Sequence, residues 1–111
     1  QNLITQYGDD LSYVFVVGDP TGYGALAAIQ AAGSSTKIVG FDAGQTACEY
    51  IADETVGKIW EAEVAQDPHG IGSGIVDKMA EYFTTGAIAG EQKDLIDCQL
   101  VTKENVADYL N

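Results

Sequence analysis

The sequence contains no arginine, and only five of its 111 residues are basic. All five are lysines, namely Lys37, Lys58, Lys78, Lys93 and Lys103. Because a guanidinium can grip a carboxylate or phosphate with two parallel hydrogen bonds and an ammonium cannot, the chain lacks the usual side chain for holding an anionic ligand. Seventeen acidic residues bring the net charge to -12, which repels phosphate backbones and anionic membranes. We therefore expect no nucleic acid among its partners.

Long hydrophobic runs are also missing. No segment approaches the roughly 20 consecutive apolar residues of a membrane-spanning helix. The first residues lack the basic and then apolar pattern of a secretory signal peptide. Hydrophobic residues nevertheless make up 46% of a chain that has the size of one small domain, which is enough for a packed core. We expect the sequence as given to be folded and soluble.

Residue sets for catalysis, metal binding or nucleotide binding are poor. The single histidine, His69, stands four residues before Ser73 and could in principle meet Cys48, but no third group is placed to orient it. The glycines of GDPTGYG are not followed by Gly-Lys-Ser/Thr and lack the GxGxxG spacing. Acidic pairs such as Asp9-Asp10 show no calcium-loop spacing. We expect no enzyme, no cofactor and no metal site.

The two cysteines, Cys48 and Cys98, lie far apart and match no metal or redox motif. Two interpretations stay open at this point. The pair could form a disulfide, or each could be a small apolar side chain within a core.

Strand-like and helical segments alternate over the first half of the chain. Residues 12–17 (SYVFVV) are almost continuously apolar, which is typical of an interior strand buried on both faces. A helix is expected over residues 21–32. Asp19 and Pro20 suit its cap and its first turn, and Gly33 is a natural stop.

Further along, residues 37–41 and 59–65 have strand character, and residues 46–53 form a helical segment between them. The order of elements is therefore strand, helix, strand, helix, strand. Because neighbouring parallel strands need a crossover, usually a helix, this order predicts an α/β fold with a parallel sheet flanked by helices.

The rest of the chain has a different character. Asp67-Pro68 opens a long helix that is expected to reach Phe83. A loop over 84–92, a last strand over 96–101 and a short terminal helix from residue 102 follow. Apolar side chains recur along one face of the long helix, namely Ile71, Ile75, Met79 and Phe83. The three earlier strands already have two helices, so we expect this face to lack its partner.

Four motifs carry a family resemblance. They are, in order, VFVVGDPTGYGALAAIQAAG, KIVGFD, EVAQDPHGIG and LVTKENVADYL. Together they resemble the C-terminal portion of the periplasmic sugar-binding proteins of ABC importers, the type I group that includes the ribose and galactose receptors. This resemblance covers nearly the whole chain. It implies two α/β lobes, joined by a three-stranded hinge, that close on a ligand.

The resemblance also implies how this incomplete two-lobed protein is divided. Residues 1–66 would form the α/β unit of the C-terminal lobe. Residues 67–95 would be a helix and loop that pack on the other, missing lobe, and residues 96–111 a returning hinge strand with the terminal helix. The N-terminal part would then be a separate chain, or two copies would dimerise by exchanging the long helix.

Candidate binding residues follow from the expected sheet. Ligands of open parallel sheets bind where the carboxyl ends of the strands meet. Three positions in the sequence fall there, namely Gly18-Asp19, Phe41-Asp42 and Gln66. A carboxylate accepts several hydrogen bonds, and an amide both donates and accepts, so this set suits a ligand rich in hydroxyl groups.

The resemblance gives these positions roles. Asp42 matches the family's carboxylate for vicinal hydroxyls, with a helix cap as the alternative. Gln66 matches the hinge-side amide, with an ordinary exposed strand end as the alternative. Asp19 matches the aspartate of an Asn-Asp pair and is expected mainly to cap its helix. Gly18 stands where the family has the asparagine, so one sugar contact is absent.

Aromatic side chains are the remaining candidates, since sugar receptors stack rings on the apolar faces of their ligands. Phe41 stands in the family's Phe-Asp pair and is equally suited to a core. Tyr23 and Trp60 are further candidates, with surface or core positions as the alternatives.

The expected function is capture of a sugar or similar small polyol and delivery to the membrane permease of an ABC importer. The location would be periplasmic or extracellular, with a lipid anchor in a Gram-positive source. Lobe closure would be the mechanism, because only the closed state satisfies ligand hydroxyls from both sides. The alternative is the effector-binding domain of a LacI-type transcription regulator, which the closing LVTKEN motif disfavours.

Overall fold

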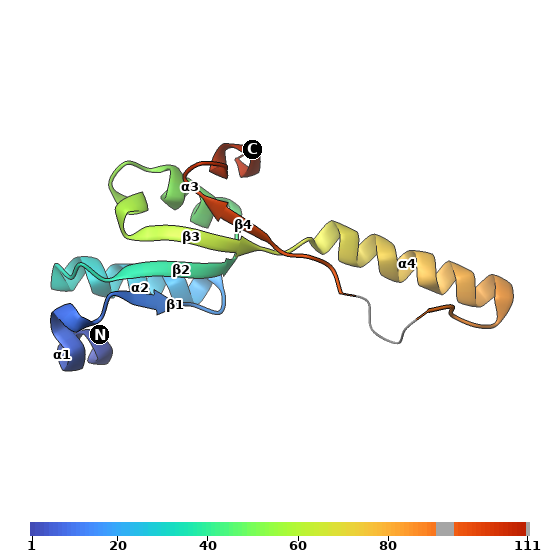
Figure 1. Ribbon diagram of the computed structural model, residues 1–111, viewed down its shortest axis with the longest axis horizontal. Coiled ribbons are helices and arrows are strands. Elements are labelled where there is room, and N and C mark those ends of the chain that lie inside the picture. The colour runs from blue at the N-terminus through green and yellow to red at the C-terminus, as the bar shows by residue number, and fades with distance from the viewer. Residues whose placement is uncertain (91–94, 111) are drawn as a thin grey trace. The chain divides into compact units, whose positions relative to one another are not determined.

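The computed structural model describes residues 1–90 and 95–110 (Figure 1). The chain divides into two compact units, of which the first is Gln1–Ala65 with Gln99–Asn111 and the second is Gln66–Cys98. The first unit contains α1 (Asn2–Tyr7), β1 (Tyr13–Phe15), α2 (Asp19–Ala32), β2 (Lys37–Asp42), α3 (Gln45–Ala52), β3 (Trp60–Ala65) and β4 (Gln99–Thr102). Three short 3-10 helices, η1 (Gly8–Asp10), η2 (Val56–Lys58) and η3 (Val106–Tyr109), complete it. The second unit contains α4 (Pro68–Thr85).

The first unit is an α/β fold, as the order of the segments predicts. Its sheet has the order β1-β2-β3-β4. The first three strands are parallel, whereas β4 runs antiparallel to β3, so the sheet is mixed. The Tyr23 ring of α2 meets the Tyr50 ring of α3 with centroids 5.9 Å apart, so both helices cover the same face of the sheet (Figure 1).

The position of β1 corrects one expectation. The apolar run over residues 12–17 predicts an interior strand, but β1 is the outermost strand and only three residues long. Tyr13, Phe15 and Val17 are 53%, 60% and 77% exposed. An apolar run indicates a surface that needs covering, and among the described residues nothing pairs with the outer edge of β1.

The local signals for helix ends at Pro20, Gly33 and Asp67 are confirmed. Pro20 lies in the first turn of α2, and Gly33 ends that helix with a left-handed φ of 61°. Asp67 caps α4 by accepting a 2.8 Å hydrogen bond from the Gly70 N–H. Helix α1 is not anticipated by the sequence pattern. The expected loop over 84–92 extends outside the described residues.

The C-terminal segment differs from its expectation by a few residues. Strand β4 begins at Gln99 rather than at residue 96. The expected terminal helix is the 3-10 helix η3, which starts at Val106 after a turn at Asn105. Val101 and Val106 are buried, so this segment closes one side of the core.

The core lies between the sheet and helices α2 and α3. Its largest fully buried apolar side chains are Trp60, Ile29, Ile38, Ile51, Val101 and Cys48. Cys48 is therefore a core side chain, whereas Cys98 is exposed, and both thiols are free. The disulfide interpretation of this pair is wrong for this structure.

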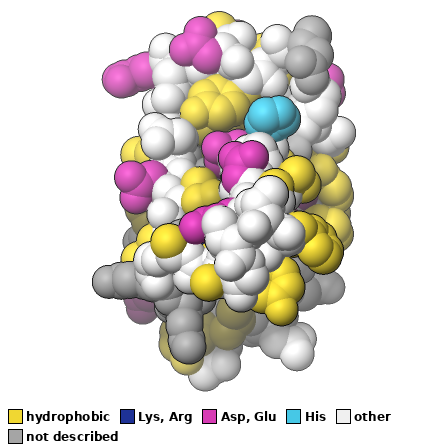
Figure 2. Space-filling view, turned by 90° about the vertical axis from the view of Figure 1, so that its right-hand side faces the viewer, with side chains coloured by type: hydrophobic (Ala, Val, Ile, Leu, Met, Phe, Trp, Pro, Cys, Tyr) yellow, Lys and Arg dark blue, Asp and Glu magenta, His cyan; other side chains and the backbone are white. Residues whose placement is uncertain are grey.

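Helix α4 has no buried residue. Ile75, Met79 and Phe83 are 56%, 52% and 77% exposed, so the apolar face of α4 is uncovered among the described residues, as expected. Hydrophobic side chains accordingly reach the surface beside acidic ones (Figure 2). No described helix combines the length and the apolar character needed to cross a bilayer.

Candidate functional site

The strongest candidate site is the rim formed by the carboxyl ends of β1 and β2. Asp42 is the last residue of β2, and it pairs in register with Ala65, the last residue of β3. Gly18 adjoins Asp42 closely, because a Cβ added to Gly18 would lie 3.1 Å from Asp42 Oδ2. The structure therefore brings Gly18, Asp19 and Asp42 together in the first unit. Gln66 is exposed and belongs to the second unit.

Asp42 begins a short segment, residues Asp42, Ala43 and Gly44, that we call the rim loop. Asp42 has a φ of 113° and Ala43 a φ of 54°, and these are the only two positive values among described residues other than glycine. Left-handed backbone costs on the order of 1–3 kcal/mol for such residues and tends to persist where the surroundings enforce it. Asp42, the first residue of this strained turn, is exposed.

Two buried carboxyl groups hold the rim loop from below. Glu63 Oε2 accepts a 3.2 Å hydrogen bond from the Ala43 N–H. Asp19 Oδ2 accepts a 2.8 Å hydrogen bond from the Gly44 N–H. Since these are the two N–H groups that follow Asp42, the two carboxyls fix the backbone that presents its carboxylate.

The role expected for Asp19 is thereby corrected. Helix α2 has Gly18 at its N-cap and no side-chain cap hydrogen bond, because the helix begins earlier than the sequence suggests. Asp19 lies in the first turn and bonds Gly44, which is the N-cap residue of α3. The N-cap position of α3 is occupied by Gly44, two residues after Asp42.

Glu63 is a residue that the sequence analysis missed. It is fully buried, and its Oε1 accepts a 2.6 Å hydrogen bond from the indole N–H of Trp60. Gly40 pairs with Glu63 in register, and a Cβ at that glycine would overlap the Glu63 carboxyl. The one sequence signal that could have indicated Glu63 is Gly40, because a glycine inside a strand often marks a place where another group approaches closely.

Burial sets the electrostatics of these carboxyls. The pKa of Glu63 is raised to about 7, chiefly by desolvation and also by the negative charges of Asp19 and Asp42, and in spite of the hydrogen bonds that lower it. The pKa of Asp19 is also raised, chiefly by burial. The rim therefore rests on acidic groups that hold protons more tightly than usual.

Aromatic side chains near the rim divide into core and rim positions. Trp60 is fully buried and packs its ring on those of Tyr23 and Tyr50, with centroids 5.7 Å away from both. Trp60 is therefore a core residue and not a surface for stacking a ligand. Phe41 is half-buried in β2, directly before Asp42.

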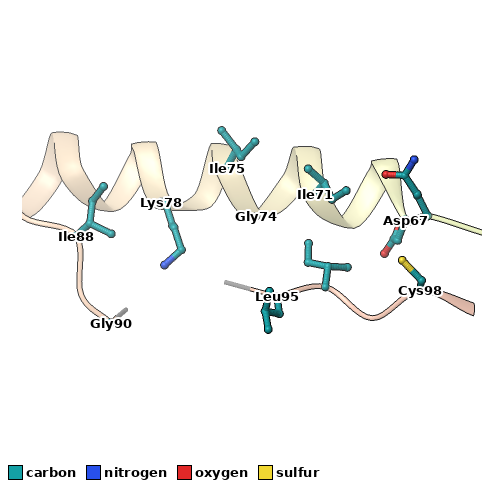
Figure 3. Close-up of a pocket in the computed structure, with 11 residues that line it drawn as sticks. Asp67, Ile71, Gly74, Ile75, Lys78, Ile88, Gly90, Leu95 and Cys98 are labelled. Atoms are coloured by element: carbon teal, nitrogen blue, oxygen red, sulfur yellow. The ribbon is translucent and has the colours of Figure 1, made fainter. Parts of the chain in front are cut away.

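The second unit contains a hollow of about 700 Å³ along α4. Its lining is mainly apolar, with Ile71 and Ile75 from the helix and Leu95 from the segment before β4. Lys78 extends from α4 towards the side on which Leu95 and Cys98 lie (Figure 3). This hollow runs along the uncovered face of α4. The α4 hollow has few polar side chains in its lining, whereas the rim has the carboxyl groups of Asp19 and Asp42.

Solved structures resemble this chain over almost its full length. A solute-binding protein of an ABC transporter from Agrobacterium vitis, solved with allitol, superposes with a TM-score of 0.81 at 22% identity, over 97% of this chain and 37% of that one. An ABC sugar transporter subunit from Rhodobacter sphaeroides gives 0.75 at 27% identity, over 94% and 36%. The myo-inositol binding protein of Caulobacter, bound to myo-inositol, gives 0.77 at 25% identity, over 96% and 36%. The chain thus spans little more than a third of the length of these proteins.

Sequence comparison points to the same group. A search of curated protein sequences gave no match. The sequence model of the periplasmic binding protein domain, however, matches residues 1–87, which is most of the chain. The chain belongs to the periplasmic binding protein domain family, as its four motifs suggested.

Proposed function

We propose that this chain is part of the solute-binding component of an ABC importer and binds a sugar or similar small polyol in a cleft between two lobes. The observation that carries the proposal is the rim loop. An exposed carboxylate, Asp42, stands on strained backbone that two buried carboxyls hold in place. Strain maintained in this way is typical of binding sites.

The chemistry of the rim favours a neutral ligand with many hydroxyl groups. A carboxylate accepts hydrogen bonds from two neighbouring hydroxyls, whereas it repels an anion. In the proposed site Asp42 binds vicinal hydroxyls, and Gln66 supplies a donor and an acceptor. Gly18 leaves room beside the ligand, and Phe41 offers apolar surface. Asp19 does not need to contact the ligand, because its role in the site is to hold the Gly44 N–H of the rim loop.

The relatives support the same ligand class. One relative, at 25% identity, is named for binding myo-inositol, and another, at 27% identity, is named as a subunit of a sugar transporter. By analogy the partner of this protein is the membrane permease of an ABC importer, and its location is periplasmic or extracellular, with a lipid anchor if the source is Gram-positive.

A second lobe is part of this proposal. The uncovered face of α4 and the hollow beside it need an apolar partner. We infer that they are covered either by the N-terminal part of the same protein, present as a separate chain, or by a second copy of this chain in a dimer that exchanges α4. Sedimentation of the 111-residue chain should show self-association that Met79→Glu weakens and Asp77→Asn leaves intact. A stable compact monomer with α4 ordered would contradict this arrangement.

Ligand binding is tested by thermal shift in the native assembly. The screen should include allitol, myo-inositol, pentoses, hexoses and furanosides, and we expect at least one of them to raise the unfolding temperature. Asp42→Asn keeps the size of the side chain, removes its charge and should abolish that shift. The control is Asp9→Asn, at an exposed position in η1, which should retain it. A shift unchanged in Asp42→Asn would remove Asp42 from the site.

A further inference from the structure

Glu63 and Asp19 form a pair of buried carboxyls in which one of the oxygens lacks a hydrogen-bond partner. Glu63 is 0% exposed and Asp19 is 7% exposed. Both oxygens of Glu63 accept hydrogen bonds from N–H groups, and so does Oδ2 of Asp19. Asp19 Oδ1 is the only buried side-chain nitrogen or oxygen among the described residues that has no hydrogen-bond partner. A buried acceptor left unpaired is costly, so a donor is expected beside it.

The neighbouring group that can become that donor is Glu63. Its carboxyl lies close enough to act as a side-chain hydrogen-bond partner of Asp19 and to lower the pKa of Asp19. Two ionised carboxylates cannot hydrogen-bond each other, because both only accept. The contact therefore requires one proton. Since burial raises the pKa of Glu63 to about 7, Glu63 is the group that holds it near neutral pH.

We propose that Glu63 and Asp19 are positioning residues for Asp42, joined by one proton that Glu63 donates to Asp19 Oδ1. With that proton present, the pair holds the Ala43 and Gly44 N–H groups as one unit. When the proton is lost, two buried negative charges face each other below a third, Asp42. Their repulsion loosens the rim loop and weakens its hold on vicinal hydroxyls. The effect on binding rests on the proposed function, whereas the proton pair itself does not.

The other titratable groups that interact with Glu63 do not account for a titration near pH 7. Tyr23 of α2 and Cys48 of α3 are the titratable side chains that interact with it from the helices. Burial raises the pKa of both, so both stay neutral in the range where Glu63 titrates. Asp42 at the end of β2 and Asp19 of α2 are the charged groups that face it. A change near pH 7 at this site therefore reports the loss of a proton from the Glu63–Asp19 pair.

The chain supplies its own reporter and control. Trp60 is the only tryptophan, and its indole N–H bonds Glu63 directly. Glu63→Gln keeps the size of the side chain and places a permanent NH2 donor next to Asp19, so it removes the titration. Glu61→Gln is the matched control, because Glu61 lies in the same strand but bonds Lys37 and Tyr13 instead.

The experiment follows the Trp60 indole N–H and the Ala43 amide by NMR between pH 5 and pH 9, and measures polyol affinity in the native assembly over the same range. In the wild type and in Glu61→Gln we expect a step near pH 7 in both signals. Affinity should fall roughly tenfold from pH 6 to pH 8, the factor that corresponds to about one hydrogen bond. In Glu63→Gln both signals and the affinity should be independent of pH.

A wild type without the step, or a Glu63→Gln variant that keeps it, overturns the proton pair. A clear step accompanied by pH-independent affinity overturns the positioning role. If the wild type binds no polyol at any pH, the proposed function fails, while the Trp60 and Ala43 signals still decide whether the pair shares a proton.

Discussion

The indole N–H of Trp60 donates a 2.6 Å hydrogen bond to Oε1 of Glu63, three residues further along β3. Side chains three apart in a regular strand point to opposite faces of the sheet. Here the register between β2 and β3 shifts between Ile38 and Val39, so that Ile38 pairs with Trp60 and Val39 with Ala62. This irregularity puts Trp60 and Glu63 on the same face, and it links the core to the carboxyl that holds the rim loop.

The close contact between Gly22 and Trp60 predicts opposite effects for two similar substitutions. A Cβ at Gly22 would overlap the Trp60 ring, so Gly22→Ala should lower the free energy of unfolding by about 1–3 kcal/mol and shift the Trp60 fluorescence. Gly24, in the same helix, has nothing within 4 Å of an added Cβ. Gly24→Ala should raise stability by up to about 1 kcal/mol, through helix propensity. Chemical denaturation measures both, and equal effects of the two variants would contradict the packing described.

Stability should fall as the pH rises from 5 to 8. Glu63 has a pKa of about 7 in the folded protein against 4.5 ordinarily, so between these values only the folded state keeps the proton. Raising the pH through this window therefore favours unfolding, by at most about 3 kcal/mol. The raised pKa of Asp19 acts in the same direction.

Other shifted acidic groups act outside this window. Hydrogen bonds lower the pKa of Asp53 and of Glu61, so their stabilisation is present above their ordinary values and is lost only in acid. Denaturant titrations at pH 5, 6, 7 and 8 measure the effect. In Glu63→Gln most of the fall should disappear. Wild-type stability that is flat or that rises across this range would be incompatible with a buried, proton-holding Glu63.

The left-handed backbone of Ala43 predicts that replacing this alanine by glycine does not destabilise the fold, unlike the same change within a helix. Its φ of 54° is unfavourable for alanine and free of strain for glycine, so Ala43→Gly should be neutral or stabilising by up to about 1 kcal/mol. The same change at Ala27, at an exposed position within α2, should cost about 1 kcal/mol. Thermal unfolding compares them, and an equal loss in both variants would mean that Ala43 is not held in the left-handed region.

Local sequence signals predicted much of this fold. The order of strands and helices, the proline in the first turn of α2 and the glycine that ends it follow from backbone chemistry that neighbouring residues decide. The Asp67 cap of α4 and the apolar face of that helix also depend only on residues close together in the sequence. The position of Asp42 at the rim could be predicted because strand ends of a parallel sheet meet at one edge, which is a property of topology and not of packing.

The features that were missed depend on contacts across the sheet. The edge position of β1 depends on which strands accompany it, and its sequence shows only that Tyr13 and Phe15 need cover. Glu63 looks like a surface residue in an alternating strand. Its burial follows from the register shift, from the space left by Gly40 and from the bond to Trp60. These relationships appear only when β2 and β3 are paired.

The central claim is that the rim loop binds the ligand, and an NMR titration of the native assembly with the polyol found by thermal shift tests it most directly. We predict saturable shifts of the Gly18, Asp42, Ala43 and Gly44 amides, with the same dissociation constant, and their loss in Asp42→Asn. Shifts confined to the residues that line the α4 hollow, such as Ile71, Ile75 and Leu95, with the rim amides unchanged, would contradict it.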